Sequence, residues 1–209
     1  MTDTHFKTDN NLFDAILLKT RRIGHGFSLY KHPKLIDMVK EKQILIESCP
    51  ISNEVLRYSA SIMSHPLPAL LARGVKASLS NDDPRYVSPF CLLLMHPPTS
   101  HPQAIDGSLN IKANTNKKNS SMMGQNSATL TYDFWQALQG WENLGLAGLG
   151  SMAHNSVRWA AYEDLSDEEW IVDVQAGEDG TGTRERRIKE WNGEWEDFCK
   201  WIVKEFENE

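Results

Sequence analysis

Two neighbouring carboxylates, Asp82 and Asp83, follow a short segment of apolar and small residues at 77–80, and Pro84 ends the run. A strand over 77–80 would carry both carboxylates to its C-terminal end, where parallel α/β barrels place their chemistry. There one carboxylate can bind a metal ion while the other hydrogen-bonds a substrate. The residues Asn-Asp-Asp-Pro at 81–84 also suit an ordinary turn. Residues 77–84 alone therefore leave both interpretations open.

A histidine between two glycines lies upstream, in the segment 22–27, Arg-Ile-Gly-His-Gly-Phe. Glycines on both sides allow a sharp turn and let another group approach the backbone closely. If the strands are parallel, their C-terminal ends meet, so His25, Asp82 and Asp83 would lie together although they are far apart in the sequence. Three polar groups at one end of a sheet favour a functional site over a simple turn.

The elements that would position these groups alternate between helix and short buried strand from residue 11 to residue 84. Helices are expected over 12–18, from Pro33 onward, over 53–60, 66–73, 132–141 and 184–206, and strands over 22–27, 44–50 and 77–80. The strand over 44–50 is continuously apolar, which is typical of burial on both faces of a parallel sheet. Residues 1–10 are expected to be disordered or to form a loop. The alternation predicts a parallel α/β fold.

Length and composition exclude several classes of protein. A chain of 209 residues can bury a full core as one domain. Its net charge of −6 argues against nucleic-acid binding, which needs clustered basic residues. The cysteines Cys49, Cys91 and Cys199 have no paired metal-binding spacing. No segment reaches the roughly 18 apolar residues of a membrane span, and residues 1–11 lack the apolar core of a secretory signal.

Three segments occur in the order found in metal-dependent adenosine deaminases. Residues 20–27 resemble the Arg-Ile-Gly-His-Gly segment of that family, residues 47–53 (Glu-Ser-Cys-Pro-Ile-Ser-Asn) its next strand, and residues 78–84 its Asp-Asp-Pro strand end. The stretch 132–141 is most similar to the adenosine deaminase-related growth factor branch. Any one segment would be a weak signal, but three in order are specific. The chain thus resembles the C-terminal part of such an enzyme, over most of 10–84 and 122–207.

The resemblance implies a (β/α)₈ barrel, of which this chain would hold about the last three βα units and the C-terminal helices. It implies one zinc ion and a small purine nucleoside substrate, adenosine, which is hydrolysed to inosine and ammonia. By motif position, His25 resembles the catalytic histidine that orients or deprotonates the water on the zinc ion. Asp82 resembles the metal-ligating aspartate, and Asp83 the group that hydrogen-bonds the purine. Family members are often homodimers, relatives in the growth-factor branch are generally secreted, and neither nucleic acid nor membrane is implied as a partner.

Two segments of the family pattern have no counterpart in this chain. These are a His-X-His zinc pair, and a His-Ala-Gly-Glu segment that supplies a further zinc histidine and the catalytic glutamate. His5 is the only histidine before His25 and fits neither segment. A catalytic zinc ion usually has three protein ligands, and a whole barrel typically needs roughly 250 residues. Residues 1–209 are therefore expected to form a single incomplete domain that begins after the fifth strand and is inactive by itself.

Residues 85–121 interrupt the resemblance. They begin with an apolar run at 90–95, continue through three prolines and end in a tract rich in Asn, Lys and Ser. A structureless segment of this length is uncommon inside a compact domain, so we expect a disordered insert. It could be a lid over the site. Sequence never selected to fold, such as a translated intron, is the favoured interpretation because the insert is abrupt and differs in composition from both flanks.

Three functional hypotheses stay open. The first is an adenosine deaminase, a hydrolase acting on the C–N bond of a cyclic amidine, that is active only when the missing strands are supplied. The second is a non-catalytic remnant that binds a partner or nothing. The third is a related deaminase acting on adenine or AMP, since the Asp-Asp-Pro chemistry would be the same. Upstream coding sequence containing the two missing segments would favour the first hypothesis over the second.

Overall fold

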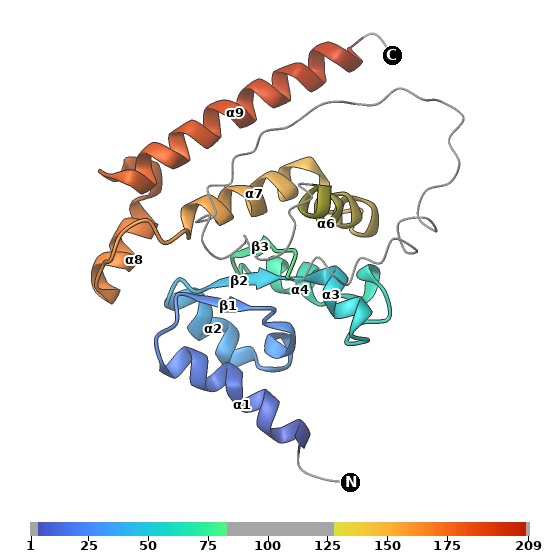
Figure 1. The fold of residues 1–209 in the computed structure, drawn as a ribbon, viewed down its shortest axis with the longest axis vertical. Coiled ribbons are helices and arrows are strands. Elements are labelled where there is room, and N and C mark those ends of the chain that lie inside the picture. The colour runs from blue at the N-terminus through green and yellow to red at the C-terminus, as the bar shows by residue number, and fades with distance from the viewer. Residues whose placement is uncertain (1–3, 83–127, 208–209) are drawn as a thin grey trace.

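Three parallel strands form the central sheet, in the order β1-β2-β3 (Figure 1). The computed structural model describes residues 4–82 and 128–207 of the chain. Within them β1 is Arg22–Gly24, β2 is Leu45–Ser48 and β3 is Ala77–Leu79. All three C-terminal ends therefore lie at one end of the sheet, which confirms the predicted parallel α/β arrangement.

Helices connect and flank the strands. The helices of the first described stretch are α1 (Thr4–Leu17), α2 (Pro33–Glu41), α3 (Pro50–Val55) and α4 (Leu67–Ala72), and those of the second are α6 (Ala128–Gly140), α7 (Gly145–Arg158), α8 (Asp167–Ala176) and α9 (Thr183–Phe206). Short 3₁₀ helices cover Phe27–Lys31 (η1), Ile62–Ser64 (η2) and Gly177–Asp179 (η4). In Figure 1, α1 and α2 lie on the β1 side of the sheet, and α6 and α7 on the β3 side. The predicted insert at 85–121 lies outside the described residues.

Local sequence signals account for several helix starts. Pro33 and Pro50 are the first residues of α2 and α3, where the missing proline N–H is tolerated. Ser166 caps α8: its hydroxyl accepts the N–H of Glu169, and the Glu169 carboxylate accepts the N–H of Ser166. The expected loop over 1–10 was wrong from Thr4 onward. Once the amphipathic segment at 12–17 is helical, each further residue adds a hydrogen bond without a new nucleation cost.

The middle strand is buried on both faces, as its continuous apolar sequence predicted. Leu45 packs in a cluster with Trp159, Trp170 and Val174. Its neighbour Ile46 points to the other face and belongs to the main core, which is built from α1, α2, α4, α6 and α7. The second stretch of the chain is thereby fixed on the sheet formed by the first stretch.

Polar side chains also join the two stretches. The amide nitrogen of Asn155 on α7 donates to the carbonyl of Ala77 in β3 at 2.9 Å. The indole of Trp141 donates to the carbonyl of Ile62 at 2.7 Å. Arg184, near the start of α9, is buried and donates to Asp173 and to the carbonyls of Arg158 and Ala160. These hydrogen bonds hold α6, α7 and the start of α9 in place.

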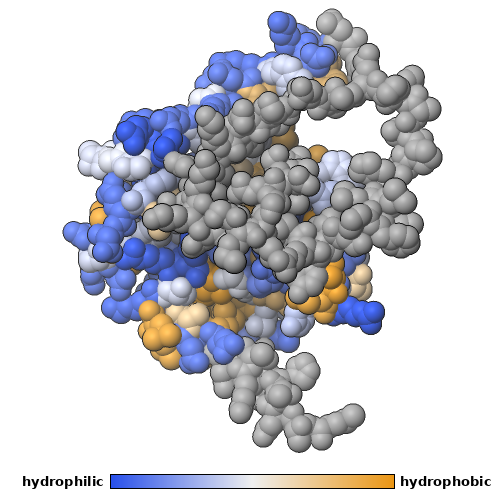
Figure 2. Space-filling view, in the orientation of Figure 1, coloured by the Kyte–Doolittle hydropathy of each residue, from blue (hydrophilic) through white to orange (hydrophobic). Residues whose placement is uncertain are grey.

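The surface is mainly hydrophilic in the view of Figure 2, with separate hydrophobic patches over the N-terminal elements in its lower half. Leu17 and Leu18, at the end of α1, are 73% and 81% exposed. The C-terminal half of α9 also keeps aromatic side chains in solvent, among them Trp201 and Phe206. The buried residues of α9, Arg184 and Ile188, both lie in its first half, so this half packs most closely on the domain. In the part of the chain that the structure describes, no helix is long and apolar enough to cross a membrane.

Candidate functional site

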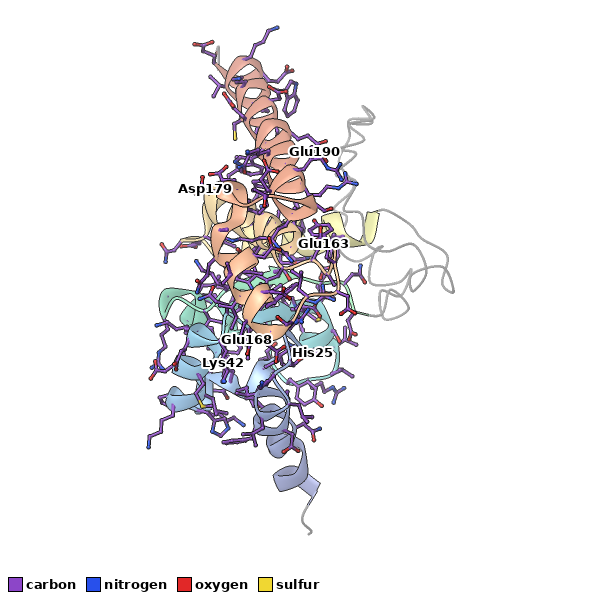
Figure 3. All side chains as sticks on the ribbon, turned by 90° about the vertical axis from the view of Figure 1, so that its left-hand side faces the viewer. His25, Lys42, Glu163, Glu168, Asp179 and Glu190 are labelled. Atoms are coloured by element: carbon purple, nitrogen blue, oxygen red, sulfur yellow. The ribbon has the colours of Figure 1, made fainter. Side chains whose placement is uncertain are left out.

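His25 and Asp82 meet at the C-terminal end of the sheet. His25 directly follows β1, and Asp82 lies shortly after β3. Nε2 of His25 is 3.3 Å from Oδ2 of Asp82, and about a third of each side chain is exposed. Figure 3 shows His25 at the level of the sheet, away from Asp179 and Glu190. Asp83, the third residue expected here, lies outside the described residues.

Unusual backbone conformations direct both side chains. His25 has φ 59° and Asp82 has φ 53°, in the left-handed region that residues other than glycine seldom adopt. The N–H of His25 still donates to the carbonyl of Glu47 at 2.8 Å, so the β1–β2 pairing continues up to the turn. Left-handed residues of this kind collect at functional sites, where surrounding structure holds the strain.

Cys49 supplies a third donor atom at the same place. It directly follows β2, and its sulfur lies within 4.8 Å of the donor atoms of His25 and Asp82. Burial, together with the negative charge of Asp82, raises the pKa of the Cys49 thiol to about 12. Nitrogen, oxygen and sulfur donors of these types are the ones that zinc binds in proteins. The three residues could therefore hold a metal ion.

Cys49 has no cysteine partner at a metal-binding spacing, so the sequence analysis did not identify it as a candidate ligand. The usable signal was its position, because Cys49 follows a buried strand just as His25 and Asp82 do. In a parallel sheet, that position alone brings a residue to the end where the other strands finish.

Asp82 has a second polar neighbour. The hydroxyl of Ser52, on α3, donates to Oδ2 of Asp82 at 2.9 Å. Hydrogen bonds of this kind orient the carboxylates that ligate metals. The sequence segment 47–53 thus contributes both a donor atom, through Cys49, and a residue that orients Asp82.

Two buried polar side chains stand behind His25. The amide of Asn53 lies between the rings of His25 and His65, 2.9 Å from Nδ1 of the first and 2.8 Å from Nε2 of the second. The N–H of Leu67 donates to Nδ1 of His65 at 3.1 Å. Burial, and in second place the charge of His25, lower the pKa of His65 to about 4. Sequence reasoning missed both residues, although Asn53 ends one of the segments that carry the family resemblance.

Asp133, on α6, is a buried carboxyl group whose charge reaches this end of the sheet. Only 3% of it is exposed, and burial raises its pKa to about 7. Its charge acts on the Cys49 thiol. The helix after the insert therefore brings a titratable group toward the strands that precede it.

Known proteins share the segment that builds this site. The family model named adenosine deaminase matches residues 9–96, which contain all three strands together with His25, Cys49 and Asp82. Over these residues the chain is similar to the adenosine deaminase family. The predicted resemblance to the C-terminal part of such an enzyme is confirmed.

Individual relatives agree with this assignment. The chain is 50% identical over 82 residues to adenosine deaminase 2 of Dictyostelium discoideum, a match that covers 39% of this chain and 15% of the relative. It is 31% identical over 165 residues to adenosine deaminase 2-A of Danio rerio, covering 78% of this chain and 25% of the relative. Adenosine deaminase 2 of Homo sapiens is 47% identical over 76 residues, 36% of this chain and 15% of the relative. The chain thus spans a quarter or less of the length of these adenosine deaminases.

A solved structure supports the fold class. Adenine deaminase from Arthrobacter aurescens superposes with a TM-score of 0.52 at 20% sequence identity, over 79% of this chain and 39% of that protein. At this identity the likeness concerns the fold alone. The chain is an α/β protein that forms part of a (β/α)₈ barrel, as predicted.

Proposed function

We propose that this chain contributes the last three βα units of a zinc-dependent adenosine deaminase. One observation carries the proposal: His25 and Asp82 lie 3.3 Å apart at the C-terminal end of a parallel sheet, inside the segment that matches the adenosine deaminase family. In this proposal Asp82 ligates the metal ion, His25 contacts the attacking water, and Asp83 hydrogen-bonds the purine ring.

The donors present fit a zinc ion. Asp82 and Cys49 offer oxygen and sulfur donors to a zinc ion, and His25 lies within reach of both, beside the place where its water would be. A bound zinc ion would lower the pKa of a water molecule to about 7 and so make hydroxide available at neutral pH. Ser52 orients the Asp82 carboxylate, and Asn53 holds the ring of His25. These residues would prepare the site before substrate enters.

The proposed reaction is hydrolytic. The oxygen of water bonds to C6 of adenosine, the C6–N bond breaks, ammonia leaves with the proton it requires, and inosine remains. His25 would act on the water, and Asp83 would hold the ring edge so that C6 faces the water. Fixing both reactants in this way removes much of the entropic barrier to their reaction.

The chain alone is proposed to be inactive. Among the described residues, one cluster of three or more candidate ligands is found, and its cysteine keeps its proton at neutral pH. A catalytic zinc site usually takes three ligands that are already deprotonated or neutral bases, plus water. The purified chain is therefore expected to deaminate adenosine, adenine and AMP at background rates only.

A chimera tests whether these residues support catalysis. The matching 82-residue segment of the Dictyostelium adenosine deaminase 2 would be replaced by that of this chain, with zinc content and adenosine turnover measured. We expect the chimera to be active, and Asp82→Asn and His25→Gln to lower turnover at least a hundredfold. Lys40→Gln, on α2, is the control and should leave turnover unchanged.

The outcomes separate the hypotheses. A chimera that folds and binds zinc but does not turn over adenosine would contradict the proposal and point to a non-catalytic remnant. Faster turnover of adenine or AMP than of adenosine would show that adenosine is the wrong substrate. The proposed roles of Asp82 and His25 would be unchanged.

A further inference from the structure

A line of buried hydrogen bonds runs from the backbone to His25. It begins at the N–H of Leu67, 3.1 Å from Nδ1 of His65, and continues from Nε2 of His65 to the Asn53 amide at 2.8 Å. The amide then reaches Nδ1 of His25 at 2.9 Å, and Nε2 of His25 faces Asp82. Asn53 is fully buried and His65 is 5% exposed. Buried polar groups need partners of the right kind, so each donor here must meet an acceptor.

A backbone N–H determines which ring nitrogen of His65 carries the proton. A backbone N–H can only donate, so Nδ1 of His65 must accept and carries no proton. His65 is then a neutral ring with its proton on Nε2, in keeping with the burial that lowers its pKa to about 4. The Nε2–H group faces Asn53 and must donate to the oxygen of that amide.

The same requirement fixes the orientation of Asn53. With the amide nitrogen toward His65, its NH₂ group and the Nε2–H group would be two donors facing each other at 2.8 Å. A half-turn of the amide removes this conflict, and the hydrogen-bond network is what distinguishes the two orientations. The oxygen then accepts from His65, and the NH₂ group donates to Nδ1 of His25.

We infer that Asn53 and His65 are positioning residues that hold neutral His25 in the tautomer with its proton on Nε2. Nδ1 of His25 accepts from Asn53, so the ring proton is on the nitrogen that faces Asp82. The chemical consequence rests on the proposed function. Neutral His25 presents an N–H donor to the site, so it orients the attacking water by donating to it and does not remove its proton.

The tautomer can be observed directly by NMR. The full chain, labelled with ¹⁵N-histidine and free of metal, would be studied at about pH 8.5, well above the ordinary histidine pKa. Long-range proton–nitrogen correlations distinguish protonated from bare ring nitrogens, and His25→Gln and His65→Gln assign the signals. We expect Nε2 to be protonated and Nδ1 bare in both rings.

Asn53→Asp is the decisive variant. A carboxylate only accepts, so Nδ1 of His25 must donate to it, and its signal should shift from the bare to the protonated position. Lys40→Gln, on α2, is the control, since it changes none of the hydrogen bonds around His25 and should leave the His25 signals unchanged.

Two results would overturn the inference. One is a wild-type His25 with its proton on Nδ1, and the other is an Asn53→Asp variant that keeps the wild-type pattern. If Asn53→Asp does not fold, the wild-type assignment decides alone. The measurement needs neither metal nor substrate, so its failure is distinct from failure of the proposed function.

Discussion

At the scale of single residues, His25 and Asp82 come together because each leaves its strand in a left-handed conformation. The chain would otherwise continue in the direction of the strand, and alternate side chains would point into the two faces of the sheet. The turn instead presents both side chains at the end of the sheet, partly exposed to solvent. Cys49 stays buried beside them with its thiol protonated, so the three donors are not equivalent.

This difference predicts which donors hold a metal ion. We expect Asp82→Asn to weaken zinc binding to the full chain at least tenfold, because it removes a negatively charged ligand. Cys49→Ser should weaken binding less, because a thiol with a pKa of about 12 gives up its proton reluctantly. Calorimetry with zinc measures both affinities. A thiolate-to-metal absorption band with cobalt at neutral pH would show instead that Cys49 is a full ligand.

Gly26 offers a second test at this scale. It has φ 54°, and an added Cβ would lie 2.9 Å from a side-chain carbon of Ile46. We expect Gly26→Ala to lower the free energy of unfolding by about 2 kcal/mol through backbone strain and overpacking. Gly24→Ala is the control, since nothing lies within 4 Å of its added Cβ. Equal urea midpoints for the two variants would contradict this account of the turn.

At the scale of the elements, two buried titratable groups oppose each other as pH changes. The folded chain keeps the Asp133 proton until about pH 7, whereas the unfolded chain loses it near its ordinary pKa of 3.8. The contribution of Asp133 to stability is therefore complete below pH 3.8 and is lost as pH rises to about 7. His65 acts in the other direction. Its folded pKa is about 4 against an ordinary 6.5, so stability is lost as pH falls through that window.

Replacing Asp133 should remove its contribution to the pH dependence of stability and leave that of His65. Between pH 4 and pH 7, Asp133→Asn should become progressively more stable relative to the parent chain, by up to about 4 kcal/mol for a shift of roughly three pKa units. Urea unfolding at a series of pH values measures the difference. Asp14→Asn, an exposed site on α1, should follow the parent profile. A pH-independent difference between Asp133→Asn and the parent would rule out this linkage.

The elements themselves could be predicted largely from the sequence. The apolar run of β2, the prolines that begin α2 and α3 and the Ser166 cap are all local signals, and the structure follows them. The partnership of Asn53 with His65 has no such signal, because it depends on how α3 and the start of α4 pack at the end of the sheet. The start of α1 was also missed, since helix propagation beyond an amphipathic segment leaves no pattern of its own.

At the scale of the whole molecule, the described sheet has two outer strands, β1 and β3. The N–H of Leu45 donates to the carbonyl of Arg21, and the N–H of His25 donates to that of Glu47. Because bonding directions alternate along a strand, the N–H of Arg22 points away from β2. Outer strands with free N–H groups pair readily with other chains. The matched adenine deaminase structure extends well beyond the part that this chain covers.

We therefore predict that the purified chain self-associates as its concentration rises, through the outer edge of β1. Arg22→Pro removes the N–H at that edge and leaves the bonds to β2 intact, since proline is tolerated at the first residue of an outer strand. Arg22→Ala is the matched control. Both variants lose the exposed ion pair with Glu47, which contributes at most about 1 kcal/mol, but only proline lacks the N–H.

Sedimentation velocity over a concentration series should show weaker association for Arg22→Pro than for Arg22→Ala. Equal association of the two variants would mean that the contact between chains lies elsewhere. The apolar end of α1 would then be the next surface to test, because Leu17 and Leu18 are highly exposed there.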